Sequence, residues 1–314
     1  MSKYKYQIEN SVAMSARFAR LLQQSDFENK EILNKVKDEK CHIYMICSRP
    51  RITFNPSNLK IEKDFVSGSF IVDKGEIKEE HFFKVPNPPN LAITSFEMEY
   101  PYSNINFLNN KGEIVSGGKA ALLYPRLQKE YNSCLDLEVL YIGQAFGEEG
   151  ERLATDRLAS HSTLQKIYLD ILTSCPNKDV WIILWQFEPY LISMMGSGFE
   201  NALIDLDGSI DHFNSVLSSS ITFDQQITFT EAALIRYFEP VYNKEYKTSF
   251  PSQSHSSYDQ CYKLDINSVA FELDTIELIT RLYSPVIAPS FWHTKHYPLY
   301  SEDIRKDMFK HFQK

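Results

Sequence analysis

The sequence predicts an α/β protein, more closely an α+β protein, in which a small mixed or antiparallel sheet is flanked by helices. Two observations favour this class. Between residues 41 and 110, short segments rich in β-branched and aromatic residues alternate with Pro, Asn, Asp and Gly, which is typical of strands joined by turns. From residue 119 onward the apolar pattern alternates between strand and helix. We therefore expect three segments: an N-terminal helix plus β-rich region (1–118), a core (119–250) with an insertion at about 188–225, and a C-terminal extension (251–314).

Size and composition limit the class of protein. The chain has 314 residues, of which 43% are hydrophobic and 24% charged, and these values are typical of a globular protein with a substantial core. The formal net charge is −8 and the pI about 5.6. An acidic balance disfavours a strongly basic nucleic-acid-binding protein, although it leaves room for a local basic cleft.

Cysteine spacing and the N-terminus favour a cytoplasmic protein. The five Cys are scattered, with no Cys-x-x-Cys pair and no zinc-finger spacing to His, so we expect reduced thiols. The first residues lack the apolar core of a signal peptide. The longest apolar run, Val180 to Trp185, is too short to span a bilayer. We expect no membrane contact, and the oligomeric state stays open.

The elements are predicted in chain order. Phe18, Leu21 and Leu22 have helical spacing, so a helix is expected within residues 1–40. HIYMIC, SGSFIV, HFFKV and AITSFEMEY predict the strands of the β-rich region. In the core we expect strands at KAALLY (119–124) and LEVLYIG (137–143), a helix over 152–172, a buried strand at DVWIILWQF (179–187), and a helix that Thr228 or Thr230 caps and Pro240 ends. The C-terminal extension predicts a strand within YKLDINSVAFEL and a terminal helix in SEDIRKDMFKHFQ.

The last helix of the core carries a carboxylate beside its apolar face. Glu231 lies three, four and seven positions before Leu234, Ile235 and Phe238, which form the apolar stripe. A charge at the edge of a buried face needs an arginine, several hydrogen-bond donors or a metal ion, because burying it alone is costly. A structural salt bridge is the alternative interpretation of Glu231.

The preceding helix carries two more polar groups on a packing face. Arg157 and His161 share this face with Leu164 and Tyr168, and a strand that contains Tyr141 comes just before. A cleft that holds Tyr, Arg, His and Glu suits phosphodiester hydrolysis. The carboxylate can bind a divalent metal, Arg can stabilise the phosphate, and Tyr or His can position or deprotonate water. A solvated helix face and an ordinary strand aromatic are the alternatives.

Residues 119 to about 247 resemble the GIY-YIG nuclease domain, over roughly two-fifths of the chain. LYIGQA is similar to the YIG half of its signature, DRLASH to its Arg-Leu-x-x-His, and TEAALIRYFEPVYN to its Glu-x-x-Leu-Ile…Pro-x-x-Asn segment. The resemblance implies a site formed by Tyr124 and Tyr141 (one of them the general base), Arg157 on the scissile phosphate, His161 in proton transfer or in holding the phosphate, and Glu231 as the ligand of Mg²⁺ or Mn²⁺. It also implies that Asn243 braces the site and that Gly143 allows close backbone approach. Lys244 belongs to a small basic edge, NKEYK, that offers a contact to a phosphate; a plain solvated surface is the alternative interpretation.

Two departures from the family pattern are clear. The first motif should read Gly-Ile-Tyr, and its best match is ALLY, which retains only Tyr124. The loop before Arg157 is long, so Arg152 is a rival for the site arginine; Arg157 is preferred because His161 follows it at the family's offset.

The resulting functional hypothesis is a metal-dependent endonuclease that acts on DNA. Two alternatives stay open: a catalytically inactive module of the same fold that binds nucleic acid or protein, and a nuclease for RNA. His293 and His296 stand three residues apart, but no third ligand accompanies them, so a metal site there is disfavoured.

Overall fold

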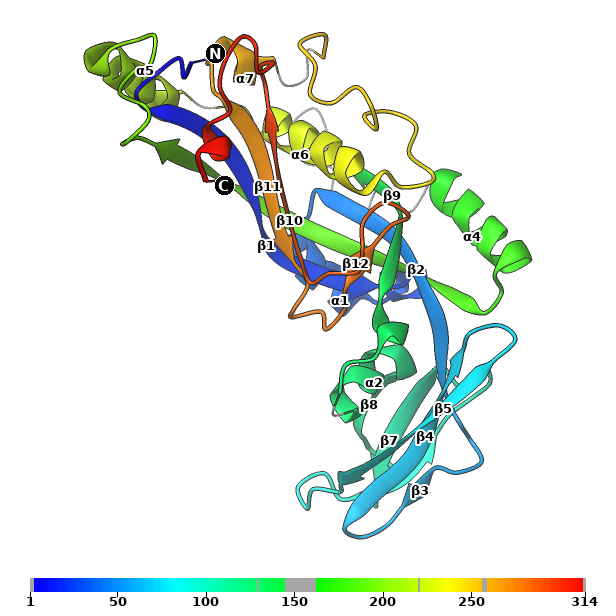
Figure 1. The fold of residues 1–314 in the computed structure, drawn as a ribbon. Helices are drawn as coiled ribbons and strands as arrows, with labels where there is room; N and C mark the ends of the chain where they lie inside the picture. Colours follow the sequence, from blue (N-terminus) through cyan, green and yellow to red (C-terminus); the bar gives the residue numbers. More distant parts are fainter. Residues whose placement is uncertain (1–2, 129, 145–161, 220, 256–258, 313–314) are drawn as a thin grey trace.

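The computed structural model describes residues 3–128, 130–144, 162–219, 221–255 and 259–312 (Figure 1). Arg152, Arg157 and His161 therefore lie outside the described residues. Within the described part of the chain, the fold is a long, curled and mainly antiparallel sheet with helices on both faces. No helix among these residues is long and apolar enough to cross a membrane.

The main sheet has ten strands among the described residues. Seven follow one another in the order β12-β9-β2-β10-β1-β11-β13, and β4, which pairs with β2, carries β3 and β5. The bounds are β1 Glu9–Leu22, β2 Ile43–Phe54, β3 Lys60–Ile61, β4 Phe65–Asp73, β5 Lys78–Pro86, β9 Leu137–Gln144, β10 Lys178–Met194, β11 Ser268–Asp274, β12 Leu282–Tyr283 and β13 Trp292–Pro298. Each of the three segments expected from the sequence contributes strands to this sheet.

The continuous apolar run of β10 follows from burial on both faces of the sheet. Trp181, Ile183 and Trp185 point into one hydrophobic core, whereas Val180, Ile182 and Leu184 point into the other. Because successive side chains of a strand point to opposite faces, a strand covered on both sides has no polar face.

Helices cover the two faces. Helix α6 packs against β9 and β11 and contributes to the first core, while α4 packs against β10 and contributes to the second. Helix α5 packs against β1, and α2 against β2. The helices are α1 Lys30–Asp38, α2 Ala120–Leu127, α4 Ser162–Ser174, α5 Leu206–Ser218, α6 Phe223–Phe238 and α7 Gln260–Lys263, and the 3-10 helices are η1 Gln24–Glu28, η2 Ser133–Leu135 and η4 Met308–Phe312.

A β-rich unit, here called the distal module, projects from the far end of β2 (Figure 1). It consists of β3, β4 and β5 and of a separate three-stranded sheet, with β6 at Ile93–Glu97, β7 at Asn104–Asn109 and β8 at Ile114–Lys119. The last residues of β2, Arg51–Phe54, pair with β4, whereas the first half of β2 pairs with β9 and β10. Strand β2 thus connects the main sheet to the distal module.

The predicted class, an α+β protein with a mainly antiparallel sheet flanked by helices, is confirmed, but the expectation of a small sheet is wrong. The N-terminal helix at Phe18, Leu21 and Leu22 is also wrong, since these residues belong to strand β1, which pairs with β10 on one side and β11 on the other. The helix of this region is α1, further along the chain.

Three further element predictions differ from the structure. KAALLY was expected to be a strand, but Ala120–Leu127 is helix α2. The helix that holds Glu231 begins at Phe223, after a cap by Thr222, so Thr228 and Thr230 lie buried inside it. Its end is as predicted, just before Pro240. The C-terminal segment forms only the short η4 instead of a full helix.

Candidate functional site

The candidate site lies where β2 begins and β9 ends. The two strands are antiparallel, with Tyr44 opposite Gly143 and Ile46 opposite Tyr141. The ring centroids of Tyr44 and Tyr141 are 6.2 Å apart, so both rings lie on the same face of the sheet. Tyr44 is fully buried, and Tyr141 is partly exposed.

Glycine is required at position 143 because the ring of Tyr44 lies over it. A Cβ atom on Gly143 would be 2.5 Å from Cζ and Oη of Tyr44 and 2.9 Å from Cε1 of Tyr141, well inside van der Waals contact. The close approach of backbone to ring is the reason for a glycine in the strand interior.

The edge of β9 is held by the segment that follows α6. The Asn243 side chain accepts a hydrogen bond from the Ile142 backbone N–H (2.9 Å) and donates one to the Ile142 carbonyl (2.8 Å). The backbone N–H of Tyr242 donates to the Leu140 carbonyl at 3.0 Å. The Tyr242 hydroxyl donates to Asp170 of α4 at 2.8 Å. One short segment therefore connects α6, β9 and α4.

Glu231 reaches the same place from α6. Leu234, Ile235 and Phe238 are buried as predicted, while Glu231 is only partly buried at the edge of their face. A pocket of about 480 Å³ is lined by Tyr44 and Tyr141 from the sheet, Glu231 and Ile235 from α6, Gln144, Thr163, and the segment Tyr242, Asn243, Lys244, Glu245 and Tyr246. We call it the tyrosine pocket.

The structure brings together several of the sequence-predicted site residues. Tyr141, Glu231, Asn243 and Lys244 all line the tyrosine pocket, and Gly143 lies in the wall behind it. Arg157, its rival Arg152, and His161 fall outside the described residues, so their predicted roles stay predictions.

Tyr124 is not part of the tyrosine pocket, and it lies in a helix instead of the predicted strand. It lies in α2, buried against Phe70, and its hydroxyl is 2.9 Å from Nδ1 of His81 in the distal module. Burial raises its pKa above the ordinary tyrosine value. Tyr124 borders a different cavity, together with His81 and Tyr131.

Tyr44 is the site residue that sequence reasoning missed. HIYMIC was predicted to be a strand, but its pairing with LEVLYIG could not be inferred, because the two strands are separated by the whole distal module. The usable signal was the sequence His42-Ile43-Tyr44, which matches two of the three residues of a Gly-Ile-Tyr motif.

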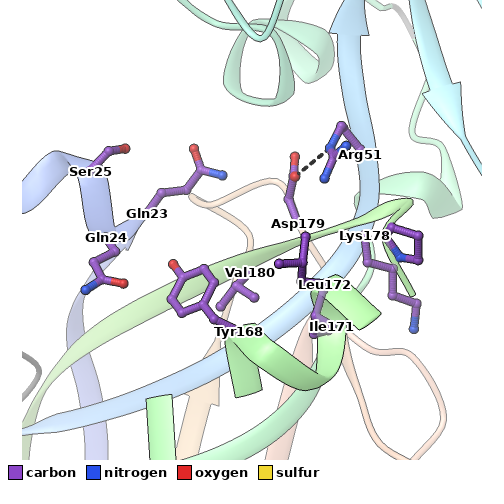
Figure 2. A pocket seen from close by; sticks show the side chains of 11 residues that line it. Gln23, Gln24, Ser25, Arg51, Tyr168, Ile171, Leu172, Lys178, Asp179 and Val180 are labelled. Carbon is purple, nitrogen blue, oxygen red and sulfur yellow. Dashed lines mark hydrogen bonds and ion pairs between the residues drawn. The ribbon is translucent and has the colours of Figure 1, made fainter. Parts of the chain in front are cut away.

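Another large cavity is chemically less suited to catalysis. It measures about 450 Å³ and lies between η1, α4 and the start of β10 (Figure 2). Its charged groups have ionic partners: Arg51 donates to Asp179 at 2.9 Å within the cavity wall (Figure 2), and Lys178 donates at 2.9 Å to Glu138, which does not line the cavity. The remaining wall is largely apolar, with Ile171, Leu172 and Val180.

His293 and His296 each have hydrogen-bond partners within the fold. His293 is buried, with Nε2 2.9 Å from the Ser290 carbonyl and Nδ1 3.3 Å from the Tyr237 hydroxyl. Burial lowers the pKa of His293 to about 4. His296 pairs with Asp307 at 3.1 Å. In the part of the chain that the structure covers, no group of three or more His, Cys, Asp or Glu is placed to hold a metal ion.

Comparison with known proteins adds no relative. No protein-family model matches the chain, and no curated protein or solved structure matches it significantly.

Proposed function

We propose that the chain hydrolyses phosphodiester bonds in the tyrosine pocket, with Mg²⁺ or Mn²⁺, and that its substrate is DNA. The observation that supports this most is the convergence of Tyr44, Tyr141 and Glu231, from three separate elements, on one pocket whose edge Asn243 holds. Pockets that combine convergent polar groups with a concave shape are the usual location of active sites.

The arrangement also supports membership of the GIY-YIG nuclease superfamily, once the first motif is reassigned. In this interpretation His42-Ile43-Tyr44 takes the place of Gly-Ile-Tyr, and Tyr44 takes the role first given to Tyr124. The strand, strand, helix, strand, helix order of the resemblance then runs through β2, β9, α4, β10 and α6. The distal module is an insertion between the first two strands.

The carboxylate oxygens in the pocket are ligands that suit a magnesium-type cation. Mg²⁺ usually keeps several waters and is bound through one or two carboxylates together with substrate phosphates. Glu231 and Glu245 both line the pocket. Glu231 would hold the ion, which would supply charge stabilisation to the phosphate as it is attacked.

Side chains of the protein would activate the water and contact the phosphate. Water attacks the phosphorus, the bond to the leaving sugar oxygen breaks, and one proton passes from the water towards a base while the leaving oxygen takes up another. Tyr141, partly exposed in the pocket and backed by Tyr44, orients or deprotonates the water. Lys244 lies exposed at the rim, where its ammonium group can contact a phosphate. By the resemblance, Arg157 stabilises the developing charge.

A plasmid-nicking assay in Mg²⁺ or Mn²⁺ tests the proposal. Glu231→Gln keeps the shape of the side chain but removes its charge, so nicking should fall by about two or more powers of ten. The melting temperature should stay close to that of the wild type. Glu239→Gln is the matched control, because Glu239 ends the same helix without lining the pocket, and its nicking should be unchanged.

The outcomes separate the alternatives. Equal nicking by the wild type and Glu231→Gln would place the activity elsewhere or in a contaminant. Cleavage of RNA but not DNA would favour the ribonuclease alternative. Binding of nucleic acid without any cleavage would favour the inactive module.

A further inference from the structure

We infer that the tyrosine pocket takes one unpaired base of the substrate and stacks it on the ring of Tyr246, so that the preferred substrate is single-stranded next to the scissile phosphate. The inference rests on the proposed function for the identity of the substrate. It concerns Tyr246 and Gln144, two lining residues of the pocket to which the proposed hydrolysis gives no role.

The rim is a short segment whose first residues are fixed by hydrogen bonds. Tyr242 is bonded to Leu140 through its backbone and to Asp170 through its hydroxyl, and Asn243 makes two bonds to Ile142. The next three residues, Lys244, Glu245 and Tyr246, line the pocket directly after these anchors. Their side chains therefore start from a backbone that the sheet positions.

Tyr246 is oriented by both its backbone and its packing. Its φ is 65°, in the left-handed region that a bulky residue rarely adopts, and such strained residues cluster at functional sites. The residue is partly buried against the first core, and the centroid of its ring is 5.3 Å from that of His255. Tyr246, which lines the pocket, is thus held against a firm support.

Gln144 supplies a hydrogen-bond acceptor. Its Oε1 atom is buried and has no hydrogen-bond partner among the residues that the structure describes, and the residue lines the tyrosine pocket. A buried acceptor without a donor is unfavourable unless water or a ligand satisfies it. The exocyclic amino group or ring N–H of a base is a donor of the required kind.

These features together describe a nucleotide subsite. Aromatic rings bind the faces of bases with little regard to sequence, and a lysine beside them neutralises the backbone phosphate. The volume of about 480 Å³ is in the range of pockets that hold small organic molecules. A base can enter such a pocket only after it has left the helical stack, which is easiest where it is already unpaired.

Binding and cleavage are measured separately on the full chain. Fluorescence anisotropy with a labelled oligonucleotide, in Ca²⁺ in place of Mg²⁺, reports binding of a single strand and of its blunt duplex. Tyr246→Leu should weaken binding of the single strand by about 5- to 150-fold, the range of one lost base-stacking contact. Tyr246→Phe, which keeps the ring, should bind like the wild type. Tyr190→Leu is the control, because it removes an exposed tyrosine ring on β10, outside the pocket.

An abasic scan of the same strand locates the base. In the wild type, an abasic nucleotide at one position should weaken binding as much as the substitution Tyr246→Leu does. Binding by the Tyr246→Leu variant should not be weakened further by an abasic nucleotide at that position. If Tyr246→Leu fails to fold, the scan on the wild type decides the question alone.

Cleavage in Mg²⁺ distinguishes this inference from the proposed function. If the wild type cuts duplex as readily as single strand, and no abasic position weakens binding, the subsite is overturned and the proposed hydrolase remains. Ring-dependent binding of the single strand without cleavage would leave the subsite and overturn the hydrolase. Absence of binding to either strand form would overturn both.

Discussion

A single amide side chain replaces a strand at the edge of β9. Asn243 offers Ile142 one acceptor and one donor, as a neighbouring strand would, although the two residues are 101 positions apart. Ile142 is buried, and the amide satisfies its N–H and carbonyl on the side of β9 where the described residues place a strand only beside Leu137 and Glu138. Asn243 follows shortly after α6, so these bonds connect the end of the Glu231 helix to the Tyr141 strand.

His293 gives the stability of the protein a predictable pH dependence. Burial lowers the pKa of its imidazole to about 4, whereas in the unfolded chain the value is near 6.5. Between these pH values the unfolded state binds the proton and the folded state does not. The free energy of unfolding should therefore fall as the pH is lowered from 6.5 to 4, by about 3 kcal/mol from this group.

Urea unfolding of the wild type and His293→Phe at several pH values from 4 to 8 measures the contribution. The variant loses the hydrogen bonds to Ser290 and Tyr237, so its stability at pH 8 is lower, but its slope between pH 6.5 and 4 should be flatter. Parallel curves for the two proteins would show that His293 does not cause the slope.

At the scale of elements, the sequence predicted side chains better than strand partners. Tyr141, Glu231 and Asn243 were matched to motifs of the resemblance, and they line one pocket together with Lys244. Tyr124 was matched to the same family pattern but lies in α2. The difference arises because the partner of β9 is set by register between strands far apart in sequence, and a single sequence does not contain that information.

Two short apolar patterns were misassigned for a related reason. KAALLY is short enough to be either strand or helix, and it is helical where it packs against β2. In β1, Phe18, Leu21 and Leu22 match helical spacing by chance within the part of the strand that pairs with β10. Tertiary pairing outweighed local pattern in both cases.

The pairing of β2 with β9 can be tested at Gly143. Gly143→Ala places a methyl group against the Tyr44 ring, and overpacking of this kind costs about 1–3 kcal/mol. Nicking should fall as well, because the displaced ring lies behind Tyr141. In a double-mutant cycle with Tyr44→Leu, the two stability losses should be less than additive, since the shorter side chain relieves the clash. Additive losses would mean that the ring does not lie over Gly143.

On the scale of the whole molecule, one buried ionic cluster joins the first and last described segments. Arg305, which is 3% exposed, forms an ion pair with the fully buried Glu9 and donates to Asp265 at 3.0 Å. The hydroxyls of Tyr6 and Tyr300 also donate to Asp265, each at 2.8 Å. The cluster fixes both segments beside β11.

Removal of Arg305 should be among the most damaging substitutions. Arg305→Met leaves Glu9 buried without its cation, which typically costs about 3–5 kcal/mol. Arg17→Met is the matched control, because the Arg17–Glu188 pair is largely exposed and such pairs contribute about 0–1 kcal/mol. Thermal or urea unfolding measures both. Similar small losses for the two variants would show that the cluster adds little to stability.

The position of the distal module between β2 and β9 has a consequence for folding kinetics. Lengthening a connection is cheap at equilibrium, since each doubling of a flexible loop costs only about 0.6 kcal/mol. The rate is a different matter, because contacts between residues distant in sequence slow folding. Strands β3 to β5 pair with near neighbours in the chain, whereas the tyrosine pocket needs β2, β9 and α6 together. We therefore expect the distal module to form early and the tyrosine pocket to be assembled late in folding.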